Sequence, residues 1–139
     1  MTAQTQDAQT PRVVLVTGGN RGIGRSIAEA FRAQGDQVVV TYRSGEAPEG
    51  VDAVRCDVSD TASVDAAFTE IEKTWGPVDV VVANAGITQD TLLMRMSEDD
   101  FTSVVNTNLT GAFRCVRRAT TSMVKARFGR IVLVSSVVG

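Results

Sequence analysis

Short runs of branched apolar residues, separated by stretches with helical spacing, constrain the fold of this chain more than any other feature. Continuous apolar runs of this length are typical of strands that are buried on both faces of a sheet. Strands that alternate with helices favour an α/β fold of βαβ units around a parallel sheet. The predicted strands cover residues 12–17, 37–42, 51–56, 78–83 and 130–135.

The first two predicted helices carry one apolar face each and have recognisable ends. One covers residues 22–34, and the next begins after Ser59 or Asp60, because either side chain can cap a helix N-terminus. Gly76 and Pro77 end this second helix. The apolar faces comprise Ile23, Ile27 and Phe31 in the first helix and Val64, Phe68, Ile71 and Trp75 in the second.

Residues 97–100 (SEDD) resemble a capping box and predict one long helix that ends near Arg127. Its predicted apolar stripe comprises Phe101, Val104, Val105, Ala112, Val116, Ala119 and Met123. Asn108 falls four residues after Val104, so we expect it on the buried stripe. A polar side chain left without partners there would cost roughly 1–3 kcal/mol. Spacing alone favours an asparagine that ties the helix to a neighbouring strand.

Composition narrows the class of protein. A chain of 139 residues with 43% hydrophobic and 22% charged residues is typical of one globular domain, and we place it at residues 12–139 after a flexible tail, residues 1–11. A net charge of −2 gives no basic footprint for nucleic acid. Without an apolar run of membrane-spanning length or a signal peptide, we expect no membrane partner and a cytoplasmic protein.

The chain contains no histidine, which excludes Ser-His-Asp and Cys-His hydrolysis and nearly all zinc sites within these residues. We therefore predict no metal site. Cys56 and Cys115 lack the spacing of metal ligands, and we expect both to be reduced residues of the core.

A glycine-rich turn, residues 17–24 (TGGNRGIG), directly follows the first predicted strand and opens the first predicted helix. Glycines permit a tight turn, let the backbone approach a pyrophosphate, and let the helix pack closely on the strand. The phosphates then meet free N–H groups at the helix N-terminus. No Lys-Ser/Thr pair follows the last glycine, which argues against a P-loop. The residues predicted to bind a dinucleotide here are Gly18, Asn20, Arg21, Gly22, Ile23 and Gly24.

The glycine spacing resembles that of the short-chain dehydrogenase/reductase family, and the resemblance extends over nearly the whole chain beyond the tail. The other matching segments are Asn84-Ala85-Gly86, Asp57-Val58, Asn108-Leu109-Thr110-Gly111 and Ser135-Ser136-Val137-Val138-Gly139. The resemblance implies a Rossmann-like, doubly wound parallel sheet, with the first five strands in the order 3-2-1-4-5 and the C-terminal part missing. It also implies an NADP-binding domain that is incomplete.

The resemblance assigns roles to single residues of this chain. Asp57 and Val58 correspond to the pair that contacts the adenine, and Asn84, Ala85 and Gly86 to a segment beside the coenzyme. Two further residues correspond to catalytic positions. Asn108 would hold a water in a proton relay, and Ser136 would bind the substrate carbonyl and stabilise the developing alkoxide.

The second predicted strand bears on the choice of coenzyme. An NAD enzyme of this fold usually has an acidic residue near the end of that strand, whereas residues 40–43 (VTYR) end in Arg43. Arg21 adds a second guanidinium within the glycine turn. Two arginines suit a ribose 2′-phosphate, which favours NADPH/NADP+ over NADH. Arg43 taken alone could equally be a solvated loop residue.

The family's catalytic acid is a tyrosine with a lysine four residues later. Tyr42 is the chain's one tyrosine, and Glu46 occupies the fourth position after it. We therefore interpret the chain as an N-terminal fragment of a reductase, inactive and marginally stable by itself.

Within the family, residues 17–24, 92–96, 108–113 and 128–131 most resemble 3-oxoacyl-[acyl-carrier-protein] reductases, above all the actinobacterial, mycolic-acid-associated form. The implied reaction is NADPH-dependent reduction of a 3-oxoacyl thioester, bound to acyl carrier protein or coenzyme A, in fatty-acid biosynthesis. The implied assembly of the complete enzyme is a homo-oligomer, a tetramer by resemblance. Three alternatives stay open, namely another alcohol or steroid oxidoreductase of the family, a non-catalytic nucleotide-binding module, and, more distantly, a Rossmann methyltransferase.

Overall fold

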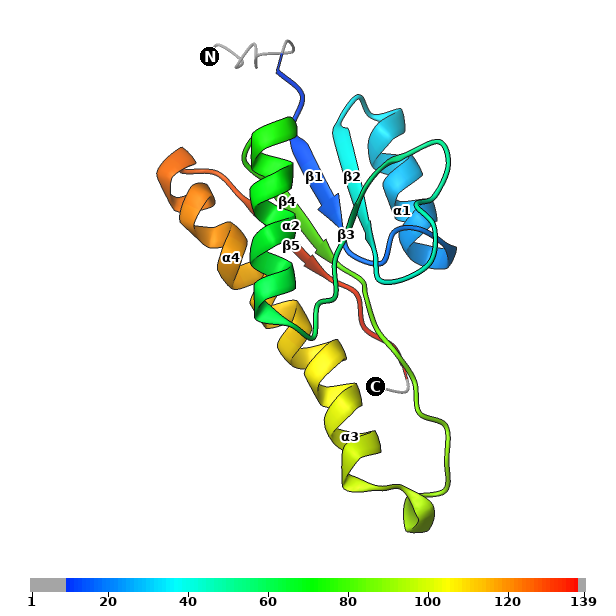
Figure 1. The fold of residues 1–139 in the computed structure, drawn as a ribbon. Helices are drawn as coiled ribbons and strands as arrows, with labels where there is room; N and C mark the ends of the chain where they lie inside the picture. Colours follow the sequence, from blue (N-terminus) through cyan, green and yellow to red (C-terminus); the bar gives the residue numbers. More distant parts are fainter. Residues whose placement is uncertain (1–9, 138–139) are drawn as a thin grey trace.

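The computed structural model describes residues 10–137 and contains one parallel sheet with the strand order β3-β2-β1-β4-β5 (Figure 1). Every pair of neighbouring strands is parallel, which confirms the predicted order and the Rossmann-like class. The strands are β1 (Val13–Val16), β2 (Gln37–Tyr42), β3 (Asp52–Arg55), β4 (Val80–Ala83) and β5 (Arg130–Leu133). Residues 1–9 of the predicted tail and residues 138–139 of the last motif lie outside the described residues.

Helices cover both faces of the sheet, because successive side chains of a strand point to opposite faces. Helix α1 (Gly22–Ala33) packs on one face, where Ala28 joins Val14 and Val16. Helices α2 (Thr61–Thr74) and α4 (Gly111–Ala126) lie on the other face in Figure 1. There the fully buried Phe68 of α2 belongs to the same core as Leu15 of β1.

Two helix caps agree with the sequence. The Asp60 carboxylate accepts a hydrogen bond from the backbone N–H of Ala62 and caps α2. The capping box predicted over residues 97–100 is also present, since Ser97 and Asp100 exchange side-chain and backbone hydrogen bonds at the start of α3 (Glu98–Val104).

The predicted long helix is present from Glu98 to Ala126 and ends at the predicted place, but its middle is π-helical. A π-helical segment (Val105–Thr110), here called the π-turn, separates α3 from α4, and a short 3-10 helix (Leu93–Arg95) precedes α3. A π-turn contains more residues per turn than an α-helix, so the predicted apolar spacing does not continue through it. Of the predicted stripe, Ala119 and Met123 are buried, and the other buried positions are Thr107, Gly111 and Cys115.

The predicted burial of Asn108 and of Phe101 is wrong. Asn108 is exposed, while the neighbouring Thr107 is buried. Phe101 is 63% exposed, because α3 extends past the end of the sheet and has no strand beneath it (Figure 1).

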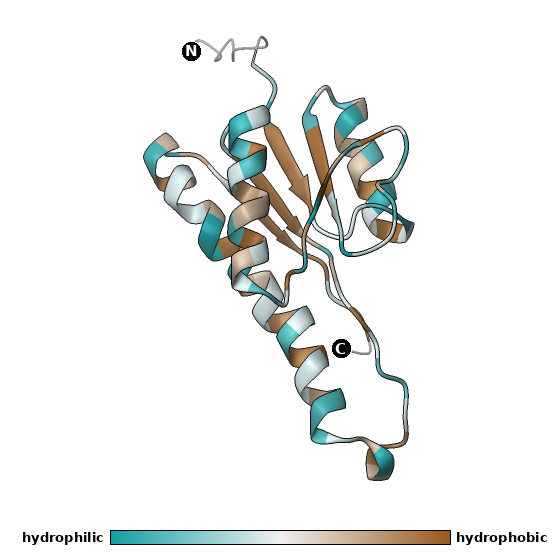
Figure 2. Cartoon of the chain, in the orientation of Figure 1, coloured by the Kyte–Doolittle hydropathy of each residue, from teal (hydrophilic) through white to brown (hydrophobic). Residues whose placement is uncertain are grey.

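Strand β5 forms one edge of the sheet, and its apolar side chains are exposed among the described residues. Ile131 and Leu133 are 45% and 63% exposed, whereas β4 beside them is fully buried. Figure 2 shows the same apolar colouring on β5 as on the central strands. Within residues 10–137, no helix combines the length and the apolar character that crossing a membrane would require.

Candidate functional site

A cavity of about 540 Å³ lies where β1 to β4 end and α1 begins. Open α/β sheets bind ligands at this edge, at the point where the strand order reverses. Every position predicted to contact the coenzyme lines this cavity. The lining residues are Gly18, Asn20, Arg21, Gly22, Ile23, Gly24, Thr41, Arg43, Ser44, Cys56, Asp57, Val58, Asn84, Ala85, Gly86, Ile87 and Thr107.

The glycine turn brings backbone against backbone at two positions. Gly18 has a φ of +64°, and a Cβ atom placed on it would lie 3.0 Å from the Cα of Ala85. A Cβ on Gly24 would overlap the side-chain amide of Asn84 and lie 2.6 Å from the Gly18 carbonyl oxygen. A side chain at either position would therefore displace the turn or the segment after β4.

The hydroxyl of Thr17 holds the ends of β1 and β4 together. Its Oγ1 accepts hydrogen bonds from the backbone N–H groups of Asn84 and Ala85, both at 3.0 Å. The Asn84 amide in turn donates to the carbonyl oxygens of Thr17 (3.1 Å) and Gly18 (3.3 Å). Asn84 thus supports the glycine turn, while its backbone lines the cavity.

The N-terminus of α1 differs from those of α2 and α3. Its N-cap residue, Arg21, is extended, and no side chain of that residue bonds the first turn. As in α2 and unlike α3, the first turn contains no acidic residue. Helix N-termini carry partial positive charge and unpaired N–H groups, so this end of α1 can accept an anion from the cavity.

Three charged groups contribute to the lining of the cavity. Arg21 and Arg43 both contribute to the lining, and Asp57 is its sole carboxylate among the described residues. Asp57 Oδ1 accepts hydrogen bonds from the Ser59 hydroxyl (2.6 Å) and the Ser59 backbone N–H (3.0 Å). The Ser59 hydroxyl is the main cause that lowers the pKa of Asp57, and the positive charges of Arg43 and Arg114 lower it further. Asp57 is therefore an ionised, oriented acceptor at neutral pH.

Neither cysteine has the properties of a nucleophile. Burial raises the pKa of Cys56 to about 11 and that of Cys115 to about 12. Both thiols are buried and unoxidised, so at neutral pH they are protonated. This agrees with the prediction that both are reduced core residues, although Cys56 also lines the cavity.

The two predicted catalytic positions lie outside the cavity lining. Asn108 Oδ1 accepts a hydrogen bond from the Ile87 N–H (2.8 Å), and its Nδ2 donates to the Ile87 carbonyl (2.9 Å). Asn108 therefore ties the π-turn to the segment after β4, the kind of structural bond that spacing alone favoured. Ser136 is exposed and follows β5, beyond Val134, whose N–H donates to the Ala83 carbonyl at 3.0 Å.

Sequence reasoning missed two threonines that hold this site. Thr17 bridges β1 and β4, and Thr41 Oγ1 accepts a hydrogen bond from the Gly18 N–H at 3.1 Å. Both are nearly fully buried polar residues in otherwise apolar strands. A single threonine at the end of a valine-rich strand could have predicted this role, because a buried hydroxyl group there needs a hydrogen-bond partner.

The family model described as short chain dehydrogenase matches residues 12–139. The chain is 56% identical to the 3-oxoacyl-[acyl-carrier-protein] reductase MabA of Mycobacterium avium, over 92% of this chain and 50% of that relative. It is 43% identical to the 3-oxoacyl-[acyl-carrier-protein] reductase FabG of Staphylococcus aureus (strain N315), over 90% of this chain and 56% of that relative.

Among solved structures, a short-chain dehydrogenase from Streptomyces avermitilis superposes with a TM-score of 0.84 at 33% identity. The match covers 93% of this chain and 50% of that one. The chain thus spans about half the length of the relatives it matches. These matches and the cavity described above agree, and the chain belongs to the short-chain dehydrogenase family.

Proposed function

We propose that this chain is the NADP-binding part of a reductase that converts a 3-oxoacyl thioester, bound to acyl carrier protein, to the 3-hydroxyacyl form. The observation that carries the proposal is that all the residues predicted to contact the coenzyme line the same cavity. The names of the MabA and FabG relatives support the substrate class. Fatty-acid biosynthesis is the corresponding setting.

The residues present fit a dinucleotide. Gly18 and Gly24 let the turn pack against Ala85 and Asn84, where a Cβ atom would not fit, and this keeps the backbone of the turn at the cavity. The uncapped N-terminus of α1 suits the pyrophosphate, and Asp57 supplies an oriented acceptor for the adenine end. A bound nicotinamide would supply hydride for reduction of a ketone.

The preference for NADPH rests on Arg21 and Arg43, which both line the cavity. Guanidinium groups bind phosphate oxygens bidentately, and no carboxylate near the end of β2 is there to accept bonds from a free ribose 2′-hydroxyl. We expect Arg43→Ala to weaken NADPH binding by about tenfold or more, as befits a charge-assisted contact, with little effect on NADH.

Fluorescence titration with both coenzymes tests this assignment. Arg32→Ala is the matched control, because Arg32 lies on α1 and donates to the Gly50 carbonyl outside the cavity lining. It should leave both affinities unchanged. Equal losses of NADPH and NADH affinity in Arg43→Ala would remove Arg43 from this role.

On the substrate side, Ser136 would donate a hydrogen bond to the ketone oxygen and stabilise negative charge as it develops there. Asn108 would hold a water for proton transfer. The sequence contains no tyrosine followed four residues later by a lysine, so the proton donor is not among these 139 residues. We expect this chain to bind NADPH without oxidising it in the presence of acetoacetyl-coenzyme A. Steady oxidation of NADPH, followed by absorbance, would contradict this part of the proposal.

A further inference from the structure

Arg114, on the first turn of α4, makes four hydrogen bonds, which reach the loop before α2, the first residue of α2 and the π-turn. Its Nη1 donates to the carbonyl oxygens of Val58 (3.0 Å) and Asn106 (3.1 Å), and its Nη2 donates to Asn106 Oδ1 (2.7 Å). Its Nε donates to the hydroxyl of Thr61 at 3.2 Å. The guanidinium therefore bonds both the loop between β3 and α2 and the π-turn.

These two segments meet closely around Arg114. The Asn106 side-chain amide donates to the Ser59 carbonyl at 3.4 Å. A Cβ atom on Gly111, where α4 begins, would lie 2.8 Å from the Val58 side chain. The loop after β3 and the start of α4 are thus in close contact, and the hydrogen bonds of Arg114 and Asn106 join that loop to the π-turn.

Both segments also form walls of the cavity. Val58 lines it directly, and so does Thr107 of the π-turn. Asn108, the next residue of the π-turn, holds Ile87 by its backbone N–H and carbonyl, and Ile87 is part of the lining. A shift of the π-turn would move Thr107, Asn108 and Ile87 together.

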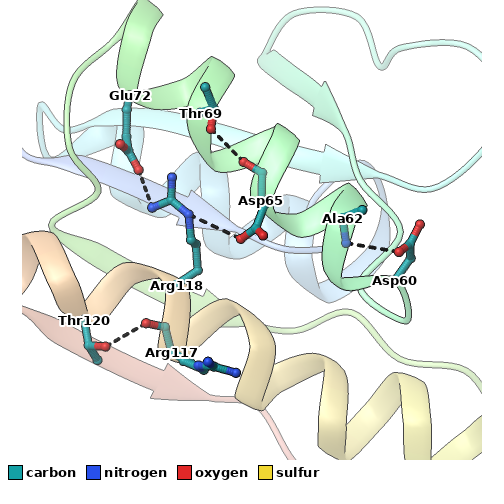
Figure 3. Close-up of polar contacts among 8 residues, drawn as sticks. All are labelled: Asp60, Ala62, Asp65, Thr69, Glu72, Arg117, Arg118 and Thr120. Carbon is teal, nitrogen blue, oxygen red and sulfur yellow. Dashed lines mark hydrogen bonds and ion pairs between the residues drawn. The ribbon is translucent and has the colours of Figure 1, made fainter.

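Arg118, one turn further along α4, differs from Arg114 because it forms ion pairs with carboxylates. It pairs with Asp65 (3.5 Å) and Glu72 (2.6 Å) of α2 (Figure 3). Its guanidinium also lies over the Phe68 ring. Arg114 has no ion pair with a carboxylate anywhere in residues 10–137. Its donors are directed instead at carbonyl oxygens and side-chain oxygens of the segments it joins.

We infer that Arg114 is a positioning residue that fixes the π-turn against the loop after β3, and thereby sets the Val58 and Ile87 walls of the cavity. The expected effect on coenzyme binding rests on the proposed function. The structural content of the inference, the link from Arg114 to Ile87, stands independently of any ligand.

Hydrogen exchange of the Ile87 amide, followed by NMR without coenzyme, tests the structural link, because this N–H is bonded to Asn108 of the π-turn. Arg114→Ala should raise its exchange rate about tenfold or more, the scale expected for losing charge-assisted hydrogen bonds. The Thr17 amide, bonded to the Val82 carbonyl between β1 and β4, is the internal reference and should keep its rate. Arg118→Ala is the matched control and should leave Ile87 unchanged.

Two further variants keep the test decisive. Arg114→Lys retains the charge but loses the planar fork, so Ile87 should exchange nearly as fast as in Arg114→Ala. If Arg114→Ala fails to fold, Asn106→Ala removes one acceptor from the same network and should accelerate Ile87 exchange in the same direction. An unchanged Ile87 rate in the folded variants, or an equal rise in Arg118→Ala, would overturn the inference.

Titration with NADPH then tests the consequence for the cavity. Arg114→Ala should weaken NADPH binding about tenfold, in parallel with faster Ile87 exchange. Faster exchange with unchanged NADPH affinity would overturn the claim that Arg114 sets the cavity walls. An unmodified chain that binds no NADPH would refute the proposed function, while the exchange experiment would still decide the role of Arg114.

Discussion

The substitution Gly24→Ala sets two physical effects against each other at the start of α1. Alanine has the higher helix propensity, which alone would stabilise this helix by about 1 kcal/mol. The added Cβ, however, would overlap the Asn84 amide and lie 2.6 Å from the Gly18 carbonyl oxygen. The sign of the change in unfolding free energy therefore reveals which effect dominates.

The magnitude follows from the contacts. Overpacking typically costs about 1–3 kcal/mol. Displacing Asn84 would also break its bonds to the Thr17 and Gly18 carbonyls, at about 0.5–1.5 kcal/mol each. Less the gain in helix propensity, the unfolding free energy should fall by about 1–5 kcal/mol.

Urea denaturation measures this change through the fluorescence of Trp75, the one tryptophan, which packs against the core. The matched control is Gly35→Ala, because Gly35 has a positive φ of 94° but no atom within 4 Å of an added Cβ. That variant should show backbone strain of about 1–2 kcal/mol without any effect on NADPH binding. A Gly24→Ala variant that is more stable than the unmodified chain, with unchanged NADPH affinity, would refute the steric argument.

Three further predictions follow from the hydrogen bonds and pKa shifts. Asp60→Ala should cost about 1 kcal/mol of unfolding free energy through loss of the α2 cap, measured by urea denaturation. Ser59→Ala should raise the pKa of Asp57, read from the ¹³C shift of its carboxyl group. Because the folded pKa of Asp57 is lowered, its contribution to stability is present above about pH 4 and is lost as the pH falls through the folded value, a loss that Ser59→Ala should reduce. Cys56 and Cys115 should resist iodoacetamide at pH 8 until urea unfolds the chain, and since their folded pKa values are raised to about 11 and 12, stability should decline as the pH rises above about 8.5. Rapid labelling of the folded chain would contradict this assignment.

The strands and the glycine turn could be predicted from the sequence because each is a local pattern with one dominant cause. Runs such as residues 37–42 (QVVVTY) have few alternatives to a buried strand, and β2 covers the same residues. The caps were also predictable, Ser97 directly and Asp60 as one of two candidates beside Ser59, since a cap depends on residues only two or three positions away. The placement of Arg21 and Arg43 beside one cavity followed from the order of the strands.

The π-turn and Arg114 could not be predicted in this way. Apolar spacing assumes one helical period, and the buried Thr107 and exposed Asn108 follow from an interruption that no local pattern announces. Arg114 bonds a carbonyl 56 residues away, at Val58, so its role depends on the assembled fold. The sequence around Arg114 does not distinguish it from Arg117 or Arg118 in the same helix.

The bridge that the Thr17 hydroxyl makes between β1 and β4 has a consequence for how a ligand would be received. This hydroxyl fixes how the ends of the two strands lie against each other, because one oxygen atom accepts from two successive backbone amides, those of Asn84 and Ala85, directly after β4. Because these hydrogen bonds are already formed, a ligand that binds at this edge would not have to draw the ends of β1 and β4 together. Ligand binding would then cost little free energy for reorganising the protein. A site that is preorganised in this way can bind a ligand tightly with few contacts.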